Sequence, residues 1–134
     1  MKKSFKDLQV WKKSIDLAEA IYKATEDFPK REHFGLAVQI RKSVVSIASN
    51  IAEGSARDGN KEFQQFLLIA RGSSAELQTQ MLIAMRVGYL TKDVYKILTK
   101  DVYKILSLRL NEIGKMLQGL KQSLAAPALL TTID

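Results

Sequence analysis

The polar residues with the most regular spacing lie in the stretch QIRKSVVSIASNIAEGSAR, residues 39 to 57. They recur at steps of three, four, three and four residues: Ser43, Ser46, Asn50, Glu53 and Arg57. Residues three and four apart are neighbours on a helix surface, so this spacing predicts a polar stripe along one helix. Its hydroxyl, amide, carboxylate and guanidinium groups can pair with a matching stripe or bind a polar ligand.

A second polar set follows in the next predicted helix and consists of Glu62, Arg71, Ser73, Glu76 and Gln80. If the two helices face each other, Asn50, Glu53 and Glu76 are expected to pair across the hairpin, and Ser73 allows a close approach. Two interpretations remain open. In the structural one, Asn50, Glu53, Ser73 and Glu76 form a polar network that fixes helix register or a seam between subunits. In the functional one, a small ligand or RNA is bound around Arg57. We favour the structural interpretation.

Catalytic chemistry has little support in the sequence. The chain contains no cysteine and one histidine, His33, which lies near a predicted helix start. The Glu-x-x-His pairs of di-iron bundles, glycine-rich phosphate loops, HExxH and GxSxG are all absent from the sequence. We therefore predict a protein that is not an enzyme and that has no cofactor and no metal site.

The charge balance favours an acidic partner. The formal net charge is +7 and the isoelectric point is about 9.7. Such an excess of Lys and Arg is typical of proteins that bind nucleic acid, although ordinary surface charge for solubility is an alternative interpretation. No apolar run approaches the length of a membrane span, and the basic start lacks the apolar region of a signal peptide. We expect a soluble, cytoplasmic protein that does not engage membranes.

Four segments have apolar residues at three- and four-residue spacing, and none shows sustained alternation. They cover residues 7–26, 32–53, 61–88 and 99–124. Four long amphipathic helices with short connections predict a single all-α domain over residues 1–134, an antiparallel up-and-down four-helix bundle with a frayed tail at 125–134. A helix-turn-helix DNA-binding unit around GSARDGN is a weaker alternative, because these helices are long enough to lie antiparallel.

Local signals suggest where these helices begin and end. Ser4 and Asp7 have the spacing of a capping box for the first helix. Gly54 is expected at a left-handed cap that ends the second helix, and Asn60 is expected to cap the third.

Four stretches resemble a known family: FKDLQVWKKSIDLAEAIY, FPKREHFGLAVQIRKSVVSIASNIAEGSAR, KEFQQFLLIARGSSAELQTQ and MLQGLKQSL. It is the family of four-helix-bundle proteins encoded in intervening sequences of 23S ribosomal RNA genes, whose NIAEG-x-x-R core corresponds here to Asn50–Arg57. Its relatives include the accessory variability protein of diversity-generating retroelements. The resemblance implies a ring-like homopentamer with a basic surface suited to nucleic acid, association with rRNA or the ribosome, and no known reaction.

The unit TKDVYKIL occurs twice in succession, at residues 91–98 and 99–106. Eight residues exceed two helical turns by about 80°, so an insertion inside a packed helix would turn every later side chain away from its partners. The stripe from Leu106 to Leu124 is intact. We therefore expect the second copy to keep the packed register, with Thr99 as its cap, and the first to form an extension or loop at one end of the bundle.

Together these observations predict an oligomeric bundle that binds the RNA or DNA backbone without strong sequence preference. The candidate contact residues are Lys12, Lys13, Arg41, Lys42, Arg57 and Lys61. The main alternative is a homo-oligomeric protein-interaction scaffold with no role in nucleic-acid binding.

Overall fold

The computed structural model describes residues 4–91 and 101–125, and within these ranges the chain is helical with no strand. The 3₁₀ helices are η1 (Phe5–Asp7) and η2 (Lys30–Glu32). The α-helices are α1 (Gln9–Thr25), α2 (Leu36–Ser55), α3 (Asn60–Arg86) and α4 (Val102–Ala125). The predicted all-α fold class is confirmed. Among the described helices, none is long and apolar enough to cross a lipid bilayer.

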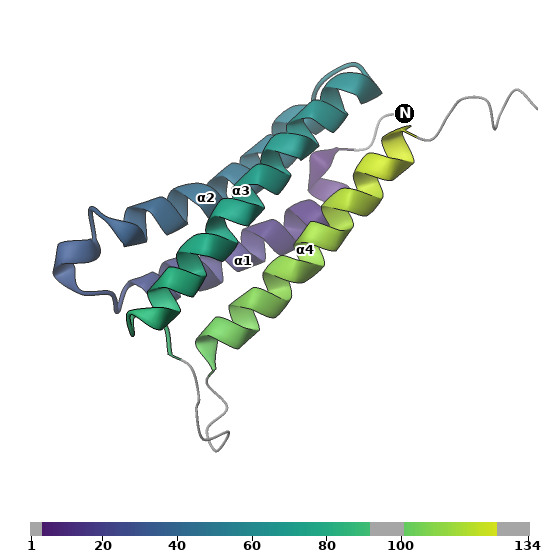
Figure 1. Ribbon diagram of the computed structural model, residues 1–134. Helices are drawn as coiled ribbons and strands as arrows, with labels where there is room; N and C mark the ends of the chain where they lie inside the picture. Colours follow the sequence, from purple (N-terminus) through teal and green to yellow (C-terminus); the bar gives the residue numbers. More distant parts are fainter. Residues whose placement is uncertain (1–3, 92–100, 126–134) are drawn as a thin grey trace, which may run out of the picture.

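The four α-helices lie side by side as a bundle (Figure 1). The α1–α2 connection lies at one end, together with the end of α3 and the start of α4, and the α2–α3 connection lies at the other. Hydrogen bonds fix the relative direction of α2 and α3. Ser43 bonds to Gln80 and Ser46 bonds to Ser73, so the position on α3 falls as the position on α2 rises. These two helices are therefore antiparallel.

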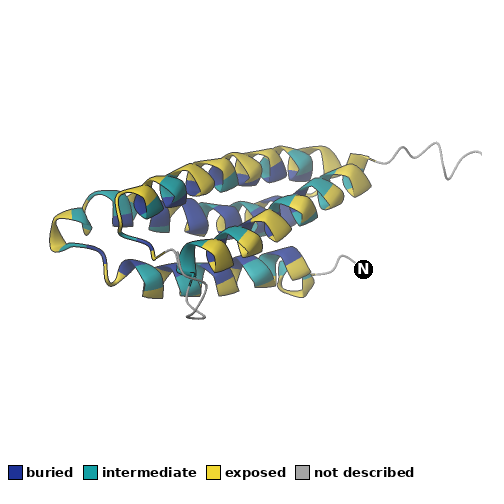
Figure 2. Cartoon of the chain, turned by 60° about the horizontal axis from the view of Figure 1, so that its bottom comes forward, coloured by how far each residue is buried: buried dark blue, intermediate teal, exposed yellow. Residues whose placement is uncertain are grey.

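The core consists of apolar side chains that recur every three or four residues on each helix. In α4 they are Leu106, Leu110, Ile113 and Leu117, all at most 3% exposed. Figure 2 shows the same division along every helix, with buried residues on the inner side and exposed residues on the outer side. Complete burial of one such side chain stabilises the fold by about 1.5–3 kcal/mol, so the spacing of apolar residues accounts for the packing of the four helices.

The helix starts differ from the predicted caps. Ser4 accepts a hydrogen bond from the Lys6 backbone N–H at 3.2 Å, and it caps η1 instead of α1. The prediction of a capping box on α1 was wrong, because the chain first forms η1 and Leu8 then occupies the N-cap position of α1 without a side-chain bond.

The third and fourth helices also start differently from the expectation. Gly59 is the N-cap of α3, and Asn60 is already its first helical residue. At α4, Asp101 accepts a hydrogen bond from the Lys104 backbone N–H at 2.9 Å, the contact that an Asp N-cap makes. Thr99, which we expected in this role, lies outside the described residues.

Two glycines near helix ends have different structural roles. The prediction that Gly54 forms a left-handed cap was wrong, because Gly54 is a buried residue within α2. A Cβ atom at this position would lie 2.6 Å from Cβ of Phe66. The absence of a side chain at Gly54 therefore allows α2 and α3 to approach closely. Gly88 instead has a φ of 87° and follows the end of α3. The Tyr89 N–H bonds to Ala84 O and the Gly88 N–H bonds to Met85 O, which is the Schellman pattern.

The duplicated unit is partly described. Residues 102–106 of the second copy form the first turn of α4, and Leu106 is buried in the core. Of the first copy only Thr91 is described. The Tyr103 backbone N–H donates to Thr91 O at 3.2 Å, so two residues twelve positions apart in sequence meet at this end of the bundle. The rest of the first copy and residues 126–134 lie outside the described residues.

Candidate nucleic-acid interface

A polar seam joins α2 and α3 along one side of their contact. The Ser43 hydroxyl donates to Gln80 Oε1 at 2.9 Å, and the hydroxyls of Ser46 and Ser73 are 2.7 Å apart. Both Ser43 and Ser73 are buried. Asn50 completes the seam from within α2, because its amide Nδ2 donates to the backbone O of Ser46 at 2.8 Å and to the Ser46 Oγ at 3.0 Å.

The seam uses other partners than those expected for Asn50, Glu53 and Glu76. Asn50 bonds within its own helix. Glu53 forms an ion pair with Arg57 four residues later, at 3.0 Å. Glu76 is exposed and lines a shallow groove over the seam. The residues that cross between the helices are therefore serines and a glutamine, and the carboxylates of Glu53 and Glu76 form no bond across the seam.

Arg41 forms several contacts with the end of α1. Its Nε donates to Thr25 Oγ1 at 2.8 Å and one terminal nitrogen donates to Tyr22 O at 3.2 Å. Its guanidinium carbon lies 4.6 Å from the centre of the Tyr22 ring. Contacts of this kind hold α1 against α2, so Arg41 has a structural role whether or not it also contacts a ligand.

The other predicted basic residues divide into two groups. Lys13 is paired with Glu112 at 3.0 Å, and Arg57 is paired with Glu53 and lies 5.1 Å over the Phe66 ring. The second group is exposed and, within the described residues, forms no ion pair: Lys12, Lys42 and Lys61. The six residues do not gather in one place. Arg41 contacts the end of α1, whereas Arg57 and Lys61 flank the α2–α3 connection at the opposite end of the bundle.

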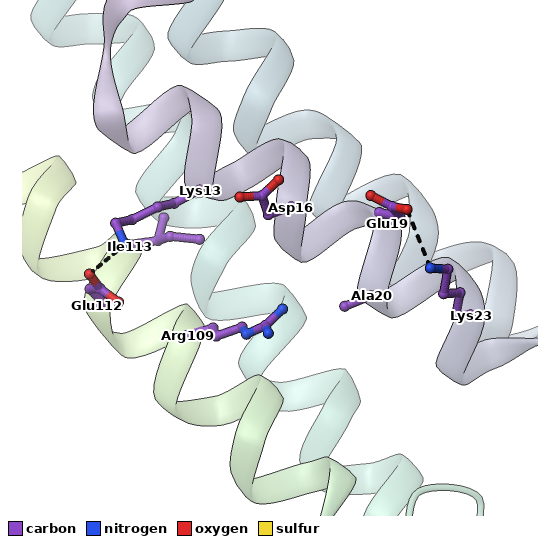
Figure 3. Close-up of a pocket in the computed structure, with 8 residues that line it drawn as sticks. All are labelled: Lys13, Asp16, Glu19, Ala20, Lys23, Arg109, Glu112 and Ile113. Atoms are coloured by element: carbon purple, nitrogen blue, oxygen red, sulfur yellow. Dashed lines mark ion pairs between the residues drawn. The ribbon is translucent and has the colours of Figure 1, made fainter.

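A groove of about 590 Å³ lies between α1 and α4 (Figure 3). Its lining includes three cations and three carboxylates, namely Lys13, Lys23, Arg109, Asp16, Glu19 and Glu112. Ion pairs join Lys13 to Glu112 and Lys23 to Glu19, and Arg109 extends from α4 toward α1 in Figure 3. Because the formal charges of the lining balance, this groove offers little attraction to a polyanion.

A second groove, of about 520 Å³, lies between α3 and α4 and has a different lining. Its polar residues are uncharged except for one lysine, and they are Ser74, Gln78, Asn111, Gln118, Gln122 and Lys115. Gly114 and Gly119 also line it. Sequence reasoning did not single out these residues. The available signal was a set of amides at helical spacing on 111–122, combined with two glycines inside a helix, where glycine is unfavourable.

The fold and the surface define a class of protein: a small basic four-helix bundle in which a polar seam joins α2 to α3. A family model described as the 23S rRNA-intervening sequence protein matches residues 6–119. The chain belongs to this family. No curated protein matches the chain.

A solved structure supports the same fold. The chain is similar to a crystal structure of a protein with unknown function from the S23 ribosomal protein family, from Bacteroides thetaiotaomicron. The two are 25% identical in sequence, with a TM-score of 0.68, and the match covers 84% of this chain and 97% of the other. Nearly the whole length of that protein therefore corresponds to the bundle described above.

Proposed function

We propose that this protein is a non-enzymatic, homo-oligomeric bundle that binds the backbone of RNA or DNA through Lys and Arg. The observation that carries the proposal is a set of exposed cations with no carboxylate partner among the described residues, which includes Lys12, Lys42 and Lys61. The net charge of +7 adds long-range attraction for a polyanion. Membership of a family named for 23S rRNA intervening sequences favours RNA, and association with rRNA or the ribosome is part of the proposal.

Binding of this kind depends on the release of counterions from phosphate. The logarithm of the association constant therefore falls linearly with the logarithm of salt concentration, with a slope of about −0.7 per neutralised phosphate on a single strand. A gel-shift titration of the full chain with unstructured RNA and with duplex DNA across a salt series measures this slope. The absence of any shift at physiological salt contradicts the proposal.

Self-association is the second part of the proposal, and the family resemblance makes the pentamer the expected assembly. An apolar groove of about 480 Å³ on the α1–α2 face supports it, because Tyr22, Val38 and Val45 line this groove beside Arg41 and Lys42. Tyr22 and Val45 are each 42% exposed. Light scattering at micromolar concentration tests the assembly, and a monomer contradicts it.

The same apolar groove favours the second candidate function, a scaffold that binds another protein. The salt series separates the two functions. A scaffold leaves RNA unshifted at physiological salt, whereas a nucleic-acid binder shifts it with the slope given above.

A further inference from the structure

An exposed stripe on α3 alternates carboxylates with isoleucines. Its members follow one another at steps of seven residues, and all are exposed: Glu62, Ile69, Glu76 and Ile83. Seven residues are close to two helical turns, so these side chains lie on one side of the helix and form what we call the α3 stripe. Isoleucine is among the residues most often buried in folded proteins, yet Ile69 is 51% and Ile83 is 48% exposed. The bundle therefore leaves about half of each isoleucine uncovered.

The apolar groove on the α1–α2 face, hereafter the α1–α2 groove, has the complementary pattern. On α2, Val38 and Val45 precede and follow Arg41 and Lys42, and Tyr22 lines the groove from α1. Both cations line the groove, and among the residues that the structure describes no carboxylate does. Each surface thus has apolar residues on both sides of a charged centre, which is negative on the α3 stripe and positive in the α1–α2 groove.

These charged centres are not neutralised within the chain. Lys42 and Glu76 both line the shallow groove over the α2–α3 seam, yet neither forms an ion pair in the described parts of the chain. Arg41 donates to neutral oxygens of α1, those of Thr25 and Tyr22, and these contacts leave its charge without a carboxylate. A partner that carries the opposite charge can therefore pair with each centre.

Charge also decides how two copies of the chain can meet. Two α1–α2 grooves that faced each other across a two-fold axis would bring cations against cations, and two α3 stripes would bring carboxylates against carboxylates. The α3 stripe of one copy against the α1–α2 groove of another brings opposite charges together and covers the apolar residues of both. Such a contact is heterologous, because it uses a different surface of each copy.

We propose that the α3 stripe of one copy packs into the α1–α2 groove of the next, an inference that rests on the self-association in the proposed function and names its two surfaces. Burial of the isoleucines and valines drives the contact, and Glu76 beside Arg41 and Lys42 fixes its direction. A nucleic-acid backbone would neutralise the cations but leave the apolar side chains uncovered, so a second copy is the better occupant. Lys12 and Lys61 belong to neither surface and remain available to nucleic acid.

The test alters one surface at a time in the full chain and measures the mass of the assembly by light scattering. Val45→Glu alters the groove, and Ile69→Lys combined with Ile83→Lys alters the stripe. The matched controls are Leu108→Glu for the groove variant and Ile105→Lys combined with Leu108→Lys for the stripe variant. Both control positions are exposed and lie on α4, outside the two surfaces. Circular dichroism checks that each variant folds.

We expect the groove variant and the stripe variant each to weaken self-association by at least about tenfold, because each buries a charge among apolar side chains and opposite a like charge. The controls are expected to keep the wild-type mass. An equal mixture of the groove variant and the stripe variant is expected to associate, because the first retains an intact stripe and the second an intact groove. Association between two variants that are each defective alone is the mark of a heterologous contact.

A charge exchange provides a second test that leaves the apolar side chains in place, in case the first variants do not fold. Lys42→Glu and Glu76→Lys each put like charges at the centre of the contact and are expected to weaken self-association by about fivefold. An equal mixture of the two is expected to restore it, because every contact of an alternating assembly then joins opposite charges. Both residues are exposed, so the fold is expected to tolerate either change.

Three results overturn the inference while self-association survives. They are an unchanged mass of the folded groove and stripe variants, an equal loss of mass in the variants and their controls, and mixtures that stay as dissociated as their components. An unchanged mass together with weaker RNA binding by Val45→Glu would also overturn it, by assigning the groove to nucleic acid. If the wild type is a monomer, self-association fails together with the inference, and the salt series decides nucleic-acid binding separately.

Discussion

Arg41 Nε lies 2.8 Å from Thr25 Oγ1, and this hydrogen bond joins the first half of α2 to the last residue of α1. Thr25 is buried and its hydroxyl donates in turn to Ile21 O at 2.8 Å. The arginine that the sequence offered as a phosphate contact is therefore part of the fold.

Arg41→Ala is expected to lower the free energy of unfolding by about 1–3 kcal/mol, because it removes two hydrogen bonds and the contact with the Tyr22 ring. Lys42→Ala is the matched control, an adjacent exposed cation with an expected change within about 0.5 kcal/mol. Urea unfolding followed by circular dichroism measures both. Equal stability of the two variants would show that Arg41 does not hold α1 to α2.

The hydroxyl pair Ser46–Ser73 lends itself to a double-mutant cycle. Each single change to Ala removes one partner of a 2.7 Å contact and is expected to cost about 1 kcal/mol, while the double variant costs less than the sum. The coupling arises because Ser46→Ala leaves the buried Ser73 hydroxyl without its partner, whereas removal of both hydroxyls leaves none unpaired. Additive unfolding free energies from urea titrations would contradict a role for this pair.

Gly54→Ala is expected to destabilise the protein by about 1–3 kcal/mol, because the new Cβ would lie 2.6 Å from Cβ of Phe66 and force α2 and α3 apart. Gly72→Ala makes the same chemical change at an exposed helical site with open space, and a gain of up to about 1 kcal/mol is expected there. Thermal unfolding of both variants reports the difference. A stabilised Gly54→Ala variant is incompatible with the close approach described above.

Gly88→Ala tests the end of α3. Its φ of 87° is readily adopted by glycine and strained for alanine, so a loss of about 1 kcal/mol is expected. Asn tolerates this conformation better than other residues, so Gly88→Asn is expected to retain more stability than Gly88→Ala. The two melting temperatures provide the comparison, and the reverse order would argue against a left-handed residue here.

Deletion of residues 92–99 removes one copy of the duplicated unit, and deletion of either copy leaves the same sequence. Thr91 and Tyr103 then become four residues apart, so their present 3.2 Å hydrogen bond becomes an ordinary α-helical one. Since α4 keeps its register, we expect the stability to be retained or raised by about 1 kcal/mol through the shorter connection. A loss of more than about 2 kcal/mol in urea unfolding would show that the bundle depends on the extra unit.

The difference between Gly54 and Gly88 shows what a local pattern can and cannot predict. Both glycines lie near the end of a helical pattern in the sequence. By that pattern alone, either one could be the residue that ends its helix in a left-handed conformation. Gly54 is an ordinary helical residue, and a side chain is excluded there by the approach of Phe66 from α3, a residue twelve positions away. Such an approach depends on how two helices pack, which a pattern of single residues does not specify.

The sequence by itself determined the all-α class and the face that α4 buries, because helical periodicity is local and apolar spacing follows it directly. It did not determine the face of α1, where Ile15 and Tyr22 are 41% and 42% exposed although their spacing is apolar and helical. The residues of the α4 stripe, from Leu106 to Leu117, are buried as that spacing predicts. Only the tertiary structure decided the polar partners: Ser43 with Gln80, Ser46 with Ser73, and Arg41 with Thr25. These depend on the rotation and register of neighbouring helices, which are set by packing between residues distant in the chain.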